Sequence, residues 1–360
     1  MVTLPKINIA FEQLATSFIE RSERGIAVLI VRDANAPEGG AFFKYKDATE
    51  VKETYTADNL AAIKDALSFG PSRVDVAVVG TAGTMAAALQ LVTKNEKTGW
   101  ITVVGGKSSD WADLVSWIKA RENEKKSWKA VVFNANAPDS MHVVNFVNAK
   151  VTFADERGEK DGSAYLPSLA GIFARCNIVR GCTNFLCSNL THVEEQADNE
   201  AAVGAGKLVL VNDEDGEVRI GVDVNSLTTT NGLTLTEDMK YIETVEAMDI
   251  MRDDIGSTFR EQYLGQYRNT LNNQMLFISA INYYFFQLAQ SNVLDPEHDN
   301  HAEIDVTAQR AAWVGSGKAE AAEWDDAKVR ANAFKRNLYF AGDVKILGSM
   351  VNFDFRVTLA

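Results

Sequence analysis

The chain has 360 residues, a formal net charge of −13, and a composition of 46% apolar and 24% charged residues. This length predicts two or three globular domains with enough chain to bury a core, and the six prolines argue against a long disordered segment. The acidic balance excludes a phosphate-binding surface over the whole molecule, although a local basic patch remains possible. We therefore expect no nucleic-acid partner.

Cysteines and apolar stretches predict neither disulfides nor membrane insertion. Cys176, Cys182 and Cys187 lie in one segment, no secretory signal peptide precedes them, and their spacing matches no common zinc site. We therefore expect free thiols. The most apolar stretch, residues 275–288, is interrupted by Asn282 and is too short to cross a membrane.

The N-terminal segment has the alternation of a strand. Ile7, Ile9 and Phe11 would share one face, and Pro5 just before them suits an edge strand or its start. The residues that follow, up to residue 24, indicate a helix or a turn. We treat residues 1–24 as an N-terminal arm and lead-in.

Strand and helix patterns then alternate through the middle of the chain. Apolar runs bounded by turn residues predict strands at residues 26–31, 74–79, 100–104 and 128–133. Helical spacing predicts helices at residues 57–68, 85–92 and 109–122. Strands joined by helices of this length imply right-handed crossovers and a mainly parallel sheet with helices on both faces. These elements predict an α/β domain over residues 25–232.

Weaker patterns fill the rest of this domain. They predict further helices at residues 142–149, 168–174 and 194–203. Two short strands, at residues 207–212 and 218–224, flank an acidic turn and predict a β-hairpin. The turn-rich stretch at residues 228–232 marks a change of composition, and we place the domain boundary there.

Residues 233–348 predict an α+β domain. Long helical patterns cover residues 237–252 and 257–289, with breaks or kinks expected near Gly256 and Gly265. Short elements of unassigned type are expected at residues 307–313 and 327–330, and two strands, 333–341 and 344–359, are expected to meet around Gly342 and Asp343.

The last residues, 349–360, form a C-terminal strand arm with an unbroken alternation. Val351, Phe353, Phe355, Val357 and Leu359 would form one apolar face. Burying five such side chains stabilises by ~8–15 kcal/mol, whereas fixing about ten residues costs ~10–20 kcal/mol of backbone entropy. The arm is thus marginal by itself. It is either a terminal strand of the protein's own sheet or a strand donated to neighbouring copies.

No segment predicts a catalytic, cofactor or metal site. Glycine-containing turns at residues 80–84 and 105–108 follow strands, but the first lacks the Lys of a Walker loop and the second lacks its first glycine. The polar cluster Asp295, His298, Asp299, His301 and Glu303 matches no familiar metal spacing, and none of the four histidines lies in a triad context. A cytoplasmic α/β nucleotide-dependent enzyme with an unrecognised site remains the alternative reading.

Several segments together carry a family resemblance over nearly the whole chain. They are residues 4–9, 22–27, 251–255, 304–310 and 344–355. In their order and positions the chain resembles the tail sheath proteins of contractile phage tails, especially the short sheath proteins of Gram-positive phages, prophages and phage-tail-like particles.

The resemblance implies a non-enzymatic subunit that assembles as stacked hexameric rings around a tail tube and contracts to drive the tube through a target envelope. Its implied partners are neighbouring sheath subunits, joined by N- and C-terminal strand exchange, together with the tube, baseplate and tail terminator proteins. The implied location is the virion tail, assembled in the host bacterial cytoplasm.

The resemblance also implies that a helix of the C-terminal domain contacts the tube. The charged stretch at residues 237–254 is our candidate, with Asp249, Arg252, Asp253 and Asp254 as contact residues because they can make charge-assisted hydrogen bonds. The alternative is that these charges are a solvated helix face or cap.

Overall fold

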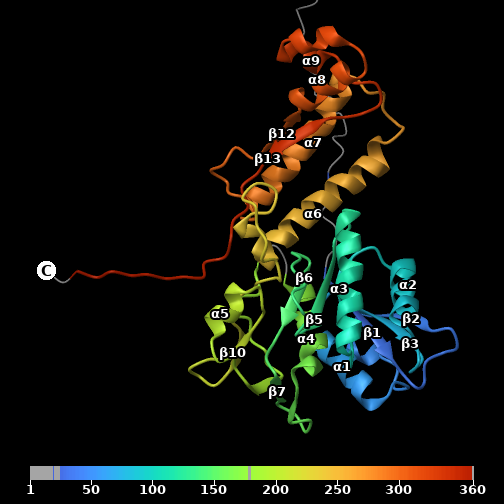
Figure 1. Ribbon diagram of the computed structural model, residues 1–360, viewed down its shortest axis with the longest axis vertical. Coiled ribbons are helices and arrows are strands. Elements are labelled where there is room, and N and C mark those ends of the chain that lie inside the picture. The colour runs from blue at the N-terminus through green and yellow to red at the C-terminus, as the bar shows by residue number, and fades with distance from the viewer. Residues whose placement is uncertain (1–18, 20–24, 177–179, 359–360) are drawn as a thin grey trace, which may run out of the picture. The chain divides into compact units, whose positions relative to one another are not determined.

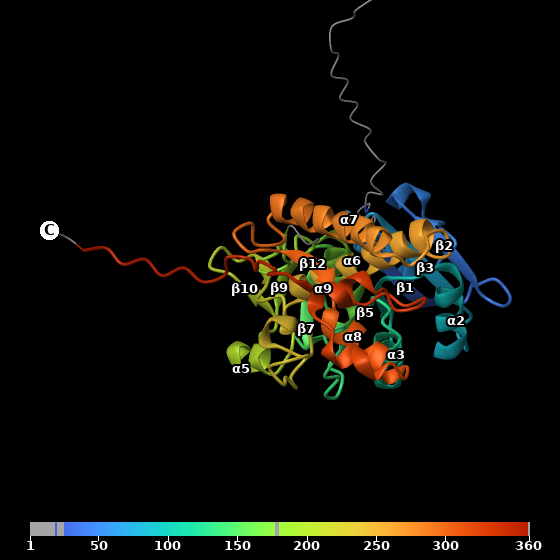
Figure 2. The ribbon, with the colours of Figure 1, turned by 90° about the horizontal axis from the view of Figure 1, so that it is seen from above.

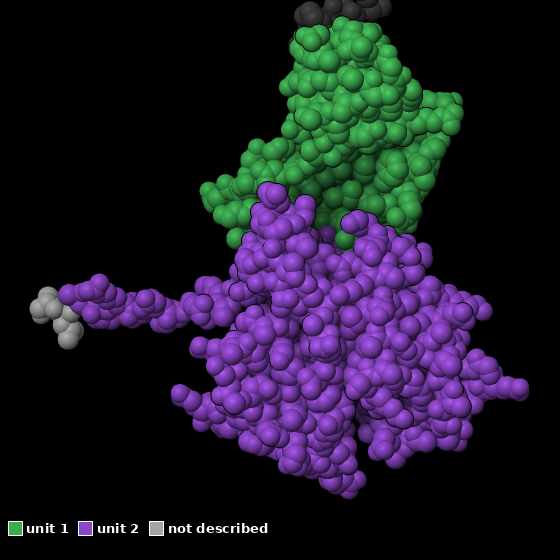
Figure 3. Space-filling view, in the orientation of Figure 1, with its two compact units in different colours: residues 1–21, 251–347 green, residues 22–250, 348–360 purple. Residues whose placement is uncertain are grey.

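The computed structural model describes residue 19 and residues 25–176 and 180–358 (Figure 1). The predicted N-terminal strand with Ile7, Ile9 and Phe11 lies outside these residues, as does Leu359. The chain divides into two compact units, which Figure 3 colours separately. We call residues 22–250 with 348–360 the α/β unit, and residues 1–21 with 251–347 the C-terminal unit.

The α/β unit is built on a sheet whose described strands lie in the order β2-β3-β1-β4-β5-β6. Strand β1 pairs in parallel with β3 and β4, and β4, β5 and β6 continue in parallel, whereas β2 is an antiparallel edge strand. The six strands span Ile26–Arg32 (β1), Ala41–Tyr45 (β2), Arg73–Val79 (β3), Gly99–Val103 (β4), Trp128–Phe133 (β5) and Val143–Phe146 (β6). Strand β1 is buried from Ile26 to Val31, as expected for a parallel strand covered on both faces.

Helices cover both faces of this sheet (Figures 1 and 2). They span Ala57–Ser68 (α1), Met85–Asn95 (α2), Ser108–Asn123 (α3) and Leu166–Arg175 (α4). The chain passes from β1 to β3 in one direction and then back over β1 to β4, so right-handed crossovers place α1 and α2 on opposite faces. Helix α4 packs beside α1, where a Cβ on Gly171 would lie 2.2 Å from the Ala66 carbonyl oxygen. The predicted α/β fold with a mainly parallel sheet is confirmed.

Smaller elements complete the α/β unit. They are Lys150–Phe153 (β7), Glu159–Asp161 (β8), Leu190–Val193 (β9), Asn199–Gly204 (α5), Leu210–Asn212 (β10) and Val218–Ile220 (β11), with short 3-10 turns at Ala48–Glu50, Gly162–Tyr165 and Glu237–Lys240. The predicted hairpin is confirmed as β10 and β11. The helix predicted at residues 142–149 is wrong, because this segment contains β6. Its Val143, Val144 and Phe146 are all buried, and a run without periodicity does not distinguish a buried strand from a buried helix.

The C-terminal unit combines helices with a short antiparallel sheet. Its elements are the second half of Ile242–Thr258 (α6), a π-helical turn at Phe259–Tyr263, Leu271–Gln290 (α7), His301–Ile304 (β12), Val306–Gly315 (α8), a 3-10 turn at Ala319–Glu323, Asp326–Ala331 (α9) and Phe340–Asp343 (β13). The two units divide between Ile250 and Met251. The break or kink predicted near Gly256 lies close to the end of α6, which changes to the π-helical turn after Thr258. The chain also breaks near Gly265, which has a left-handed φ of +77°.

The predicted strand pair around Gly342 and Asp343 is wrong. Both residues lie within β13, which pairs with β12 instead. Strand β12 lies far upstream in the sequence, and its four residues carry no pattern that identifies β13 as their partner. The short elements expected at residues 307–313 and 327–330 are the helices α8 and α9, a type that the sequence pattern did not predict.

Candidate functional site

The glycine turns at the carboxyl edge of the main sheet surround an internal ion pair. The Arg32 guanidinium, at the end of β1, donates hydrogen bonds of 2.9 and 2.7 Å to the Asp110 carboxylate and one of 2.9 Å to the Gly83 carbonyl oxygen. The same carboxylate accepts the Lys107 N–H at 2.9 Å at the start of α3, and its hydrogen bond with Arg32 lowers the pKa of Asp110. The chain's own carboxylate thus occupies the helix start where a nucleotide phosphate would bind.

The sequence also predicts no metal site and free thiols. Within the part of the chain that the structure describes, no group of three His, Cys, Asp or Glu side chains could hold a metal ion. In the polar cluster after α7, Asp295 pairs with Lys345 at 2.8 Å and His298 lies 3.3 Å from Asp343. The three cysteines are free and buried, and no described helix is long and apolar enough to cross a membrane.

The four tube-contact candidates on α6 differ in burial and in hydrogen-bond partners. Asp249 is 1% exposed and accepts Lys129 Nζ at 2.8 Å. Asp254 is fully buried in the C-terminal unit, where Tyr284 donates its hydroxyl at 2.8 Å. These two carboxylates therefore have partners inside their own units. Arg252 and Asp253 are partly exposed and stay tube-contact candidates.

Asp249 belongs to a buried charge network that attaches the first half of α6 to the main sheet. His142 Nε2, just before β6, lies 3.1 Å from Asp249. Lys129 on β5 also lies 3.2 Å from Glu246, which accepts the Trp100 indole N–H at 2.9 Å. Burial lowers the pKa of His142, but its hydrogen bonds to Asp249 and Glu122 outweigh burial and raise that pKa. Sequence reasoning missed this network, whose signal was a lysine inside an apolar strand.

The C-terminal arm, residues 349–358, is extended and outside every described strand (Figure 1). Its aromatic and aliphatic side chains are exposed: Phe353 is 89%, Phe355 71% and Val357 64% exposed, and Val351 is partly exposed. The two phenyl rings stack with centroids 5.9 Å apart. Among the described residues, no main-chain hydrogen bond joins residues 350–358 to another segment. The arm therefore offers a free main chain and an apolar row of side chains.

The root of the arm is fixed to the α/β unit. The Ser349 N–H donates to Glu243 on the first turn of α6 at 2.7 Å, and the Ser349 hydroxyl donates to the other carboxylate oxygen of Glu243. Asp223 lies next to Glu243 and accepts the Thr183 hydroxyl at 2.8 Å. Burial raises the pKa of Asp223 to about 6, and the nearby charge of Glu243 adds to the rise. The arm is thus held at one end only.

The C-terminal unit contains a short sheet to which an extended arm can bind. In the described part of the chain, β12 and β13 pair only with each other among the named strands. The outer edge of β12 is occupied at Ala302, whose N–H donates to Asn282 Oδ1 of α7 at 2.6 Å. The main-chain groups that a further strand can bind therefore lie on the outer edge of β13. Such edges accept an extended peptide by strand addition.

The sequence of the chain matches known proteins. Residues 234–360 match the family model of the phage tail sheath C-terminal domain. The whole chain is 28% identical over 374 residues to the tail sheath protein of Clostridium phage phiCD119, and both proteins are covered in full.

Solved structures share the fold. The crystal structure of a sheath tail protein from Desulfitobacterium hafniense has a TM-score of 0.68 at 15% identity and covers 83% of this chain and 94% of its own. The sheath tail protein Lin1278 from Listeria innocua has a TM-score of 0.65 at 15% identity, with coverage of 81% and 90%. The contracted helical sheath of the anti-feeding prophage has a TM-score of 0.69 at 12% identity and covers 100% of this chain and 99% of its own.

Proposed function

We propose that this chain is a member of the phage tail sheath protein family and the structural subunit of a contractile tail sheath. In this proposal it polymerises as stacked hexameric rings around a tail tube and contracts to drive the tube through the target cell envelope. It acts in the virion tail after assembly in the host cytoplasm. Neighbouring sheath subunits, the tube, the baseplate and the tail terminator are its partners.

The observation that carries the proposal is the C-terminal arm. An apolar row that includes Phe353 and Phe355 is exposed on a main chain without hydrogen-bond partners in the described structure. A neighbouring copy can accept this strand on the outer edge of β13. The donor and acceptor surfaces differ, so the contact is heterologous and propagates into rings or a helix. The N-terminal segment with Ile7, Ile9 and Phe11 serves as the second arm in this proposal.

The proposal includes no catalytic activity. The relatives are structural sheath proteins. The glycine turn at residues 105–108 does not favour a nucleotide-dependent enzyme, because Asp110 occupies the α3 N-terminus and is paired with Arg32.

Deletion of residues 350–360 tests the proposal. The arm makes no main-chain contact with its own units, so the truncated protein should fold, remain monomeric in size-exclusion chromatography and form no striated tubes in negative-stain microscopy. Full-length Asp354→Asn is the control, because it keeps every apolar side chain of the arm, and it should still form tubes. Normal tubes from the truncated protein would refute strand donation.

A further inference from the structure

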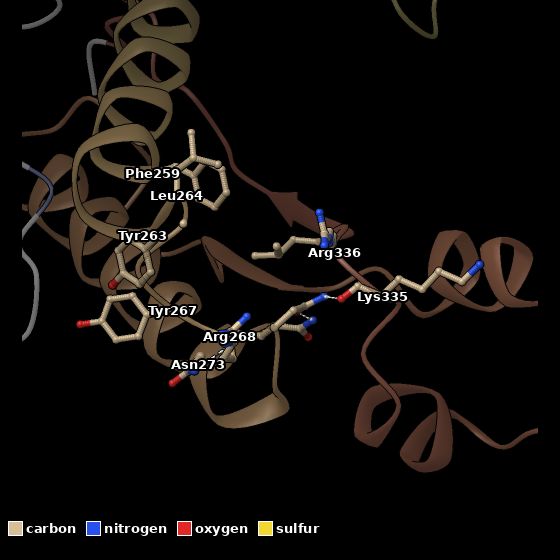
Figure 4. A pocket seen from close by; sticks show the side chains of 12 residues that line it. Phe259, Tyr263, Leu264, Tyr267, Arg268, Asn273, Lys335 and Arg336 are labelled. Carbon is tan, nitrogen blue, oxygen red and sulfur yellow. Dashed lines mark hydrogen bonds between the residues drawn. The ribbon is translucent and has the colours of Figure 1, made fainter.

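The C-terminal unit contains a pocket of about 700 Å³ beside its helix α7 (Figure 4). The π-helical turn at Phe259–Tyr263 and the loop after it form one wall, the first turn of α7 forms the floor, and residues 335–338 form the other wall. This volume lies in the range of pockets that hold drug-sized molecules. It therefore has room for two aromatic side chains.

The walls of the pocket are joined to each other by hydrogen bonds. Asn269 donates its side-chain N–H to the Asn337 carbonyl oxygen at 3.1 Å, which links the loop after the π turn to the loop before β13. Gln274 on α7 donates to Asn269 Oδ1 at 2.6 Å. The pocket is preformed, so a guest pays little ordering cost on entry.

The lining is aromatic and cationic. The ring of Tyr263 packs 4.5 Å from Phe277 and 5.3 Å from Tyr267, which is 49% exposed at the mouth. Arg268 and Arg336 also line the pocket, and its described lining includes no carboxylate. Aromatic rings bind other rings by offset stacking and edge contacts, and guanidinium groups bind ring faces. This lining suits an aromatic guest.

We infer that this pocket receives Phe353 and Phe355 from the C-terminal arm of a second copy of the chain. The two rings lie on one side of the arm and stack with each other, so they can enter together. Tyr263 and Tyr267 contact the rings, and the guanidinium groups of Arg268 and Arg336 lie over them. This inference rests on the proposed function, in which arms are donated between subunits, and adds the side-chain pocket that selects the arm.

A labelled peptide with the sequence of residues 349–358 tests the inference. Its binding to the full-length protein, kept at a concentration too low for tube formation, is measured by fluorescence anisotropy. Tyr267→Ala and Arg336→Ser should each weaken binding about tenfold. Tyr283→Ala, an exposed tyrosine of α7 that is not part of the pocket lining, should leave binding unchanged.

Variant peptides test whether Phe353 and Phe355 are the side chains that enter the pocket. Peptides with Phe353→Leu or Phe355→Leu should bind about tenfold more weakly, because a leucine cannot stack on tyrosine or on guanidinium. The Asp354→Asn peptide should bind as the native one does. Loss of binding by the Asp354→Asn peptide alone would instead assign the pocket to an acidic segment.

Two further outcomes would overturn the inference. They are equal binding by the pocket variants and absence of saturable binding by the native peptide. Microscopy of the wild-type protein separates this test from that of the proposed function. Tubes without pocket-dependent peptide binding refute the pocket alone, whereas pocket-dependent binding without tubes refutes the sheath assembly alone.

Discussion

Asp249 and Asp253 lie one helical turn apart on α6 and have the same side chain, yet their environments differ. Asp249 is buried against Lys129 and His142, whereas Asp253 is partly exposed. The sequence predicted only that both are charged residues of a helix. It could not distinguish them, because the partners of Asp249 lie on β5 and before β6, more than 100 residues upstream. Burial decides which charges are available to a partner molecule.

Replacing Asp249 by alanine should therefore destabilise the protein strongly. The change leaves Lys129 buried without its closest partner, and breaking a buried ion pair costs about 3–5 kcal/mol. Urea unfolding followed by circular dichroism measures the loss. Asp253→Ala is the matched control and should cost less than Asp249→Ala, because Asp253 is only partly buried. Equal losses for the two variants would show that the buried network does not stabilise the α/β unit.

At the scale of elements, local patterns predicted the main sheet well. Strands β1, β3, β4 and β5 and helices α1, α2 and α3 lie close to the predicted residues, because each is bounded by Gly, Pro or a cap and has a clear period. Strand β6 was missed because it is buried on both faces. The short strands β7, β8 and β9 were missed because three or four residues carry too little periodicity.

The link between α6 and the root of the C-terminal arm predicts a dependence on pH. Burial raises the pKa of Asp223 to about 6, whereas an unfolded aspartate titrates near 3.9. The folded state therefore binds a proton that the unfolded state lacks between about pH 4 and pH 6, so this group lowers stability as the pH rises through that window. Above pH 6 the charged carboxylate keeps its full destabilising effect.

Asp223→Asn should remove this effect. At pH 7.5 the variant should be more stable than the native protein by about 1–3 kcal/mol, and the difference should vanish near pH 4. Thermal or urea unfolding across this pH range measures the difference. Asp215→Asn, at the exposed tip of the β10–β11 hairpin, should give no such pH-dependent gain. A constant difference between native protein and Asp223→Asn at all pH values would contradict the assignment.

At the scale of the whole molecule, the sequence predicted an α/β region and a C-terminal region but not how distant segments pair. The family match begins at residue 234, close to the composition change at residues 228–232. The compact units divide later, between Ile250 and Met251, because Ile242, Val245 and Asp249 are buried with the α/β unit. The pairing of β12 with β13 joins segments about 40 residues apart. Neither the boundary between the units nor the pairing of β12 with β13 is indicated by a local sequence pattern.

The contact between sheath and tube belongs to this largest scale. In the proposed function this contact must hold the extended sheath and yet release on contraction, which favours a small polar contact over a buried apolar one. Arg252 and Asp253 suit this role, because they are partly exposed and can make charge-assisted hydrogen bonds with the tube. Exposed charge pairs weaken as salt screens them. The attachment of the native sheath should therefore decrease with ionic strength.

Charge reversal at these two positions tests the contact. Arg252→Glu and Asp253→Lys should each weaken the attachment of sheath to purified tail tubes, whereas sheath tubes of the contracted form should still assemble, because the arms that join the subunits are unchanged. Co-sedimentation with tail tubes over a series of salt concentrations, followed by negative-stain microscopy, measures both properties. Glu261→Lys changes an exposed charge of the same unit and should leave attachment and its salt dependence intact. If both reversal variants form extended sheaths with the native salt dependence, the tube is bound by another surface.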